Sequence, residues 1–154
     1  MIQRIQTLWL ALTALLSALL CSEYIIKFSA NTGGEIFLGF SSIYRYSGKV
    51  TESLETVLPV AVMLVLISLL SLVSLLVFKK RNLQIRITLI IIVCSVLLVG
   101  SLIFYSIKII NTYDAQPVIG FRIIFPLLIP VFSLLAYRGI KKDEKLVRSF
   151  DRLR

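Results

Sequence analysis

Long apolar stretches alternate with short polar segments along this chain. Four stretches stand out, at residues 5–26, 56–78, 87–107 and 118–137, and the first is uncharged as far as Cys21. Each comes close to the roughly 20 residues that an α-helix needs to cross a hydrocarbon layer of about 30 Å. The pattern therefore predicts an integral membrane protein with four transmembrane helices.

Residues 27–55 form the largest segment between the predicted spans. The run Asn31-Thr32-Gly33-Gly34 is typical of a turn, and the aromatic and β-branched residues after it favour one or two short strands. A single hairpin is only marginally stable in water, so we expect a small β-like cap resting on the helix ends. The expected fold of this single membrane domain, residues 1–154, is therefore all-α: a four-transmembrane-helix bundle with a minor cap.

The net charge of +9 is concentrated on one side of the predicted bundle. Basic residues follow the second span at 79–86 and fill the tail at 138–154, whereas the charges within 27–55 and 108–117 balance. Because cytoplasmic segments carry the excess of Lys and Arg, both termini are predicted to lie in the cytoplasm. The basic character thus indicates topology and does not indicate nucleic-acid binding.

The tail at 138–154 mixes basic and apolar residues. The apolar ones cluster on one side, at Leu146, Val147, Phe150 and Leu153. This arrangement predicts a short cytoplasmic amphipathic helix suited to the headgroup layer. A lipid anchor is redundant on a chain with four spans, so the alternatives are a charge block that only fixes topology and a docking surface for a protein partner. The residues of that docking surface would be Lys145, Arg148, Asp151 and Arg152.

Two spans carry small or hydroxyl side chains at helical spacing. In the first span they recur in steps of four and three, at Thr7, Ala11, Ala14 and Ala18. In the second span every third residue is a serine, at Ser68, Ser71 and Ser74. Small residues let helix backbones approach closely in lipid, and hydroxyls there usually bond to a carbonyl or to a neighbouring helix. We interpret both sets as helix-packing faces.

The residues that most catalytic chemistry needs are missing. The chain has no histidine, which excludes imidazole acid–base catalysis and the commonest metal ligand. Residues 5–21 of the first stretch and the whole of the other three predicted spans contain no carboxylate. No phosphate-binding loop or nucleophile motif occurs. Cys21 and Cys94 lie in different spans and are interpreted as packing residues. We expect no enzyme activity, no metal and no cofactor.

Arg122 lies inside the fourth predicted span, four residues after it begins. Its long side chain can reach the outer interface and bring the guanidinium to headgroups or to Asp114. The alternative is contact with an anion or a lipid headgroup, in a cleft opened by a helix kink at Pro126 and Pro130. Both interpretations fit the sequence.

The two ends of the chain are its most specific segments. Residues 1–10 read MIQRIQTLWL and residues 141–154 read KKDEKLVRSFDRLR. Together they resemble a family of small four-span membrane proteins of unknown function from Bacteroidota bacteria. The resemblance implies a bacterial inner-membrane location, and it implies no activity, cofactor or catalytic residue.

The function that we expect is that of a non-enzymatic accessory or scaffolding subunit of an inner-membrane assembly. Its partners would be membrane lipids and other inner-membrane proteins. Largely apolar spans, small-residue faces and a charged tail favour this role. The alternative is a small transporter, channel or lipid-handling protein acting around Arg122 and the Pro126/Pro130 kink. A membrane enzyme is the third possibility, and it would need Ser, Lys or carboxylate groups converging in a cleft.

Overall fold

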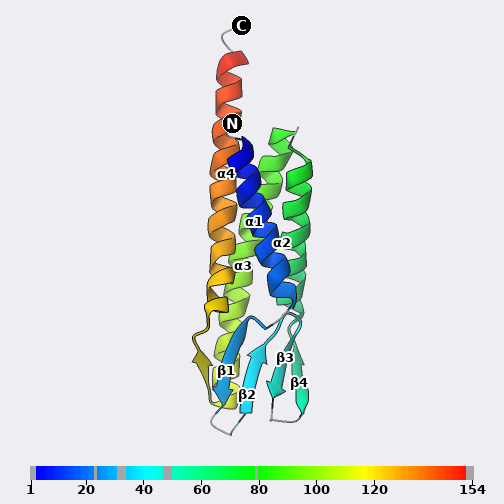
Figure 1. Cartoon of the computed structure of the whole chain (residues 1–154), viewed down its shortest axis with the longest axis vertical. Helices are drawn as coiled ribbons and strands as arrows, with labels where there is room; N and C mark the ends of the chain where they lie inside the picture. Colours follow the sequence, from blue (N-terminus) through cyan, green and yellow to red (C-terminus); the bar gives the residue numbers. More distant parts are fainter. Residues whose placement is uncertain (1–2, 23, 31–33, 47–49, 79, 152–154) are drawn as a thin grey trace.

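The computed structural model describes residues 3–22, 24–30, 34–46, 50–78 and 80–151, and at 3–4 and 145–151 the description covers the backbone alone. The elements in this part of the chain are α1 (Gln3–Ser22), β1 (Ile26–Ala30), β2 (Gly34–Leu38), β3 (Ser42–Tyr46), β4 (Thr51–Thr56), α2 (Leu58–Leu76), α3 (Arg81–Tyr113), β5 (Ala115–Val118), the 3-10 turn η1 (Phe121–Ile123) and α4 (Ile124–Asp151). The helices form an elongated bundle with the strands gathered at one end (Figure 1). We call this the sheet end, and the opposite end, where α1 begins and α4 finishes, the termini end.

The prediction of an all-α fold with a minor cap is wrong. The strands form one five-stranded antiparallel sheet in the order β4-β3-β2-β1-β5. Four strands come from the segment between α1 and α2, and the fifth comes from the connection between α3 and α4. That connection pairs with β1 in a register that sets Pro117 opposite Phe28. A proline is tolerated there because β5 is an edge strand.

The two faces of the sheet have different surroundings. Phe28 and Ile36 are paired and fully buried on one face. Arg45 pairs with Ile36 and stacks over the ring of Tyr113 at 5.6 Å, which places the end of α3 against this face. Lys27 and Phe37, paired with each other, point the opposite way, because successive side chains alternate between faces. In Figure 1 no described helix lies in front of that second face.

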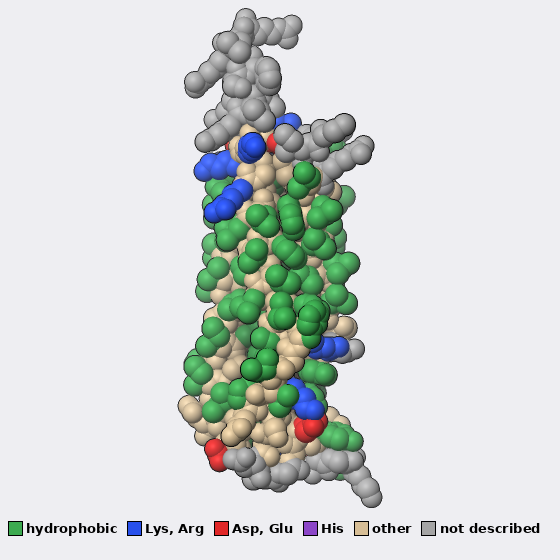
Figure 2. All heavy atoms as spheres, turned by 60° about the vertical axis from the view of Figure 1, so that its left-hand side comes forward, with side chains coloured by type: hydrophobic (Ala, Val, Ile, Leu, Met, Phe, Trp, Pro, Cys, Tyr) green, Lys and Arg blue, Asp and Glu red, His purple; other side chains and the backbone are tan. Residues whose placement is uncertain are grey.

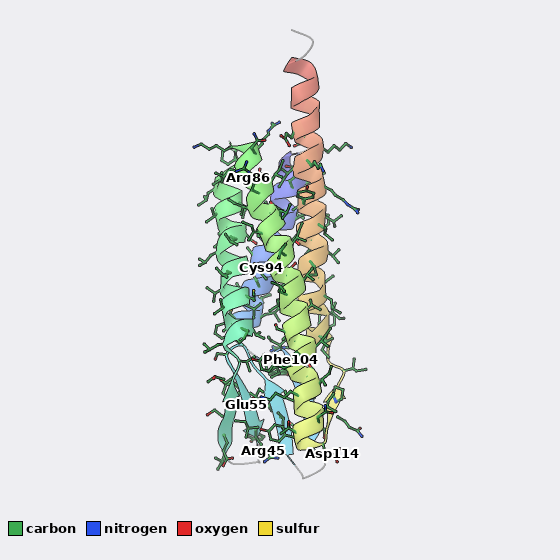
Figure 3. The ribbon with its side chains drawn as sticks, turned by 180° about the vertical axis from the view of Figure 1, so that it is seen from behind. Arg45, Glu55, Arg86, Cys94, Phe104 and Asp114 are labelled. Atoms are coloured by element: carbon green, nitrogen blue, oxygen red, sulfur yellow. The ribbon has the colours of Figure 1, made fainter. Side chains whose placement is uncertain are left out.

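Helix α3 joins the bundle to the sheet. Its 33 residues correspond to about 50 Å, against about 30 Å for α1 and α2. Figure 3 shows it running from Arg86 near the termini end to Asp114 at the far edge of the sheet, with Arg45 and Glu55 of the sheet beside its last turns. Asp114 ends the helix with a left-handed φ of 45°, a conformation that aspartate adopts more readily than most residues.

The outside of the bundle is apolar, as a lipid-facing surface requires. Each of the four helices is long and apolar enough to cross a membrane. Exposed leucines, isoleucines and valines cover them, including Leu69, Val96 and Leu127. Figure 2 shows hydrophobic side chains over the middle of one face, with Lys and Arg side chains near the termini end and others toward the sheet end. The structure thus supports a membrane protein, with a sheet added to the expected bundle.

The tail does not form a separate helix, which is a second correction to the expected fold. α4 continues without interruption from Ile124 to Asp151 and extends beyond the other helices at the termini end (Figure 1). Pro126 is the third residue of α4, where its missing N–H would have no partner in the helix, and Pro130 lies inside the helix. Gly139 is tolerated inside the helix, and the residues after it include strong helix formers such as Lys and Glu, so α4 continues.

Candidate functional site

A pocket with both polar and apolar side chains in its wall lies between the helices at the termini end. Its volume is about 270 Å³, and it is lined by Gln6, Thr7, Phe78, Arg81, Gln84, Ile140 and Asp143. These residues come from α1, from the residues just after α2, from α3 and from α4, so the pocket exists only when the helices are assembled. We call it the termini-end pocket.

One of the residues that line this pocket is a buried acid. Asp143 is only 8% exposed, and Gln6, 6% exposed, donates a hydrogen bond from Nε2 to Asp143 Oδ2 at 2.6 Å. Gly139 precedes Asp143 by about one helical turn, and a Cβ at that glycine would come within 2.8 Å of Gln6 Cγ. The glycine therefore lets α1 approach α4 closely enough for Gln6 to reach the carboxylate.

Two further side chains of the pocket, both on α3, bond to the neighbouring helices α4 and α2. Arg81 donates from Nη1 to the main-chain oxygen of Asp143 at 3.3 Å. Gln84, 7% exposed, donates from Nε2 to the main-chain oxygen of Ser74 at 3.2 Å. The hydroxyl of Ser74 also lies 3.5 Å from the hydroxyl of Thr88. Polar side chains of all four helices thus converge within this end of the bundle.

Farther into the bundle the buried hydroxyls mostly serve their own helices. Thr13, Ser17, Ser95 and Ser133 each donate to a main-chain oxygen three or four residues earlier. Ser71 is the exception among the described residues, because its buried hydroxyl has no hydrogen-bond partner. Hydroxyls bonded in this way are typical of helix interiors in lipid, so they do not extend the pocket into a polar path.

The structure separates Arg122 from Asp114. Arg122 belongs to η1, donates from Nη1 to the main-chain oxygen of Tyr24 at 3.2 Å, and stacks over the Tyr24 ring at 4.6 Å. It lines a pocket of about 240 Å³ at the junction of bundle and sheet, together with Lys27. Asp114 instead lies at the far edge of the sheet (Figure 3).

The small-residue stripe of α1 borders an open groove. Ala14 is buried, whereas Thr7, Ala11 and Ala18 are exposed. Ala11, Ala14 and Ala18 line a groove of about 550 Å³ between α1 and α2, with Ser68 on the other wall. Ser71 and Ser74 turn into the bundle and are fully buried. We call this feature the α1/α2 groove.

The remaining candidate residues give less information. Lys145, Arg148 and Asp151 lie on the last turns of α4, where the described structure covers the backbone alone, and Arg152 lies outside the described residues. Within the described residues, no group of three His, Cys, Asp or Glu side chains could hold a metal ion. Cys21 and Cys94 are free thiols.

Sequence reasoning missed the residues of the termini-end pocket. The sequence pattern places Asp143 in a solvated tail, and it gives Gln6, Arg81 and Gln84 no role in a site. One signal was available: Gln6 and Gln84 are carboxamides close to the start of apolar helices, where a polar group needs a partner. The sequence could not reveal that the partner of Gln6 is Asp143.

Comparison with known proteins adds a family and no function. No curated protein matches the chain. A protein-family model described as a domain of unknown function, DUF4293, matches residues 2–153, which is nearly the whole chain. This chain of four apolar helices and a five-stranded sheet therefore belongs to the DUF4293 family.

Proposed function

We propose that this protein is a non-enzymatic accessory or scaffolding subunit of a bacterial inner-membrane assembly, with both termini in the cytoplasm. The observation that carries the proposal is the α1/α2 groove, where Ala11 and Ala18 stay exposed beside a hollow of about 550 Å³. The chain's own helices leave this groove open. A transmembrane helix of another subunit would fill it.

The physical reason lies in how helices associate in lipid. Apolar side chains gain little by leaving lipid for a protein surface, so association depends on close packing between helices. Small side chains allow that close approach, and the α1/α2 groove presents three alanines in steps of three and four on one wall. Ser68 on the other wall could also hydrogen-bond to a neighbouring helix. A surface of this kind suits a helix better than it suits loosely packed acyl chains.

The sheet supports the same proposal. It is held to the bundle by the continuous helix α3, and one of its faces has no described helix in front of it (Figure 1). That face carries Lys27, Phe37 and Tyr44, which are in register on neighbouring strands. Aromatic residues are enriched in interfaces between proteins, and polar residues form their rim. The subunit would thus offer a contact surface outside the bilayer as well as one within it.

The test uses substitutions that fill the groove without touching the core. The tagged protein is purified from its native membrane in mild detergent, and the proteins that accompany it are quantified by mass spectrometry. Ala11→Leu and Ala18→Leu should release the partner while the subunit still folds, because both side chains are exposed. Gly100→Leu is the matched control, since Gly100 is exposed on α3 and a Cβ added there would have no neighbouring atom within 4 Å.

Two results would contradict the proposal. If wild-type protein runs as a lone subunit in native gels of gently solubilised membranes, it has no assembly to support. If partners are present but the two leucine variants retain them as the Gly100→Leu control does, the α1/α2 groove is not the contact. Ala14→Leu cannot replace these variants, because enlarging a buried alanine would strain the bundle itself.

A second candidate function, lipid handling or transport around Arg122, is favoured by one observation. Arg122 and Lys27 line the same pocket of about 240 Å³ at the junction of bundle and sheet. Cationic side chains beside a pocket suit an anionic headgroup, and Lys27 here is also ion-paired with Glu35 at 2.7 Å. Reconstitution with fluorescent anionic phospholipids would test it, because an Arg122→Gln variant should then lose lipid transfer while its assembly partners stay bound.

A further inference from the structure

Asp143 is a buried acid with no cation beside its carboxylate among the described residues. The residue is 8% exposed, and its carboxylate accepts a hydrogen bond from the neutral amide of Gln6. Arg81 contacts the main-chain oxygen of Asp143, and no Lys or Arg nitrogen of the described residues lies within 4.0 Å of the carboxylate. Burying an ionised carboxylate is costly unless a cation compensates it. The pocket beside it is where a compensating cation can bind.

The hydrogen-bond acceptors on the pocket wall favour a cation that donates hydrogen bonds. Gln6 commits its amide nitrogen to Asp143, and Gln84 commits its nitrogen to Ser74. The amide oxygens of both residues are acceptors, as is the second oxygen of the Asp143 carboxylate. A primary ammonium, with a positive charge and three N–H donors, matches such a set of acceptors.

Arg81 adds a place for an anion next to the ammonium. Its guanidinium has five N–H donors, and the bond from Nη1 to Asp143 uses one of them. Guanidinium groups bind phosphate oxygens in a planar, often bidentate geometry. The wall of the pocket therefore carries both a carboxylate and a guanidinium, which complements a ligand that carries an ammonium and a phosphate a short distance apart.

The pocket lies where a membrane lipid can provide such a ligand. The pocket lies at the termini end, where Lys and Arg side chains border the apolar surface and so mark the headgroup layer (Figure 2). Phe78, 56% exposed, stands at the pocket wall where apolar surface begins. A volume of about 270 Å³ lies just under the range of small-molecule sites, about 300–1,000 Å³. It suits a headgroup whose acyl chains remain outside against the helices.

We propose that the termini-end pocket binds the phosphoethanolamine headgroup of a membrane phospholipid, with the ammonium on Asp143 and the phosphate on Arg81. The bound headgroup compensates the buried carboxylate and ties together the ends of α1, α3 and α4. This inference is independent of the proposed assembly role, because it concerns the interior of the subunit and not the α1/α2 groove. A lipid bound here would stabilise the folded bundle by mass action.

The experiment measures lipid selectivity of the full chain. Protein freed of lipid in maltoside detergent is titrated with phosphatidylethanolamine, phosphatidylcholine and phosphatidylglycerol of identical acyl chains, and bound lipid is read by native mass spectrometry. Phosphatidylethanolamine should bind about tenfold or more tightly than the other two, because only its ammonium can donate charge-assisted hydrogen bonds to Asp143. Equal binding of the three lipids overturns the proposal, and this comparison needs no variant.

Substitutions then assign the two halves of the headgroup. Asp143→Asn keeps the shape and an acceptor for Gln6 but removes the charge, so it should abolish the preference for phosphatidylethanolamine. Arg81→Gln should weaken binding of that lipid severalfold. The matched controls are Glu52→Gln on exposed β4 and Arg86→Gln on the exposed side of α3, which make the same charge changes away from the pocket. If Asp143→Asn folds and retains the preference, the assignment is wrong.

A last arm separates a lipid from a soluble ligand. Glycerophosphoethanolamine, titrated into the same protein, carries the same ammonium and the same phosphodiester without acyl chains. It should compete only weakly with the lipid, because it lacks the contacts along the apolar surface. Binding of the soluble compound as tight as that of the lipid, and lost in Asp143→Asn, would overturn the assignment to a membrane lipid.

Discussion

Lys108 donates to both carboxylate oxygens of Glu55, with its Nζ 2.9 Å from Oε1 and 2.6 Å from Oε2. Lys108 belongs to the part of α3 that lies against the sheet, and Glu55 belongs to the edge strand β4. Glu55 is in register with Ile43, so it points to the same covered face of the sheet. The contact therefore fastens the outermost strand to the helix that supports the whole sheet.

Reversing one charge of this pair should loosen the edge of the sheet. Lys108→Glu places two carboxylates together and should lower the melting temperature of the purified protein, and Glu55→Lys should do the same. The double variant restores opposite charges and should recover most of the loss. Both side chains are over 40% exposed, so the effects should shrink as salt is added. Additive losses in the double variant would show that the two groups do not interact.

Gly39 is required in the turn between β2 and β3. A Cβ at this position would lie 2.8 Å from Tyr44 Cε2 and 2.9 Å from the main-chain oxygen of Ser42. The backbone atom cannot move aside, because Gly39 N–H donates to that same oxygen at 3.0 Å. Gly39→Ala should reduce the free energy of unfolding by about 1–3 kcal/mol, the range of overpacking costs. Gly120→Ala, with nothing within 4 Å of its Cβ, should leave it unchanged.

The ring of Tyr24 should stabilise the folded protein through its contact with Arg122. Tyr24 stacks under the guanidinium at 4.6 Å and lies 5.0 Å from the ring of Phe37. Tyr24→Leu should cost about 0.5–2 kcal/mol, since a cation–π contact and an aromatic pair are both lost. Tyr24→Phe retains the ring contacts with Arg122 and Phe37 and should reduce the free energy of unfolding by less. The free energies are measured by denaturant unfolding in detergent, and equal losses in the two variants would contradict a role for the ring.

The charge distribution predicts that the sheet end faces away from the cytoplasm. The native Cys21 and Cys94 are first replaced by alanine, and single cysteines are then placed at Ser53 on β4 or at Asn82 at the start of α3. A membrane-impermeant maleimide added to intact spheroplasts should label the cysteine at 53 and spare the one at 82. Both positions are exposed in the structure, so access depends on the side of the membrane. The opposite labelling pattern would reverse the topology.

The four apolar helices could be predicted from the sequence because a transmembrane helix satisfies its backbone hydrogen bonds within one segment. Their ends could not be predicted as well. The first helix stops at Ser22 and β1 begins at Ile26, although the predicted span extends to Ile26. The third helix runs well past its apolar run to Tyr113, because the sheet gives its last turns a surface to cover.

The sheet was decided by tertiary structure. The segment Thr51–Thr56 has two glutamates and could pass for the first turn of a helix, yet it forms the edge strand β4, where charged residues are common. The segment Ala115–Val118 contains Pro117 and has no strand pattern of its own. It becomes β5 only because the helices bring it beside β1. Strand pairing of this kind depends on partners distant in sequence, which local patterns do not reveal.

For the candidate sites too, the sequence showed one part and tertiary structure decided the rest. The alanines of the first span were visible as a stripe in the sequence. The packing of α1 against α2 decided that Ala14 is buried while Ala11 and Ala18 are exposed beside a groove. Gln6 and Asp143 are 137 positions apart, and Asp143 looked like one solvated charge among many. Composition and apolar runs determined how many helices the chain could place in a membrane. Which polar side chains those helices buried together depended on contacts between opposite ends of the chain, and only the assembled bundle creates them.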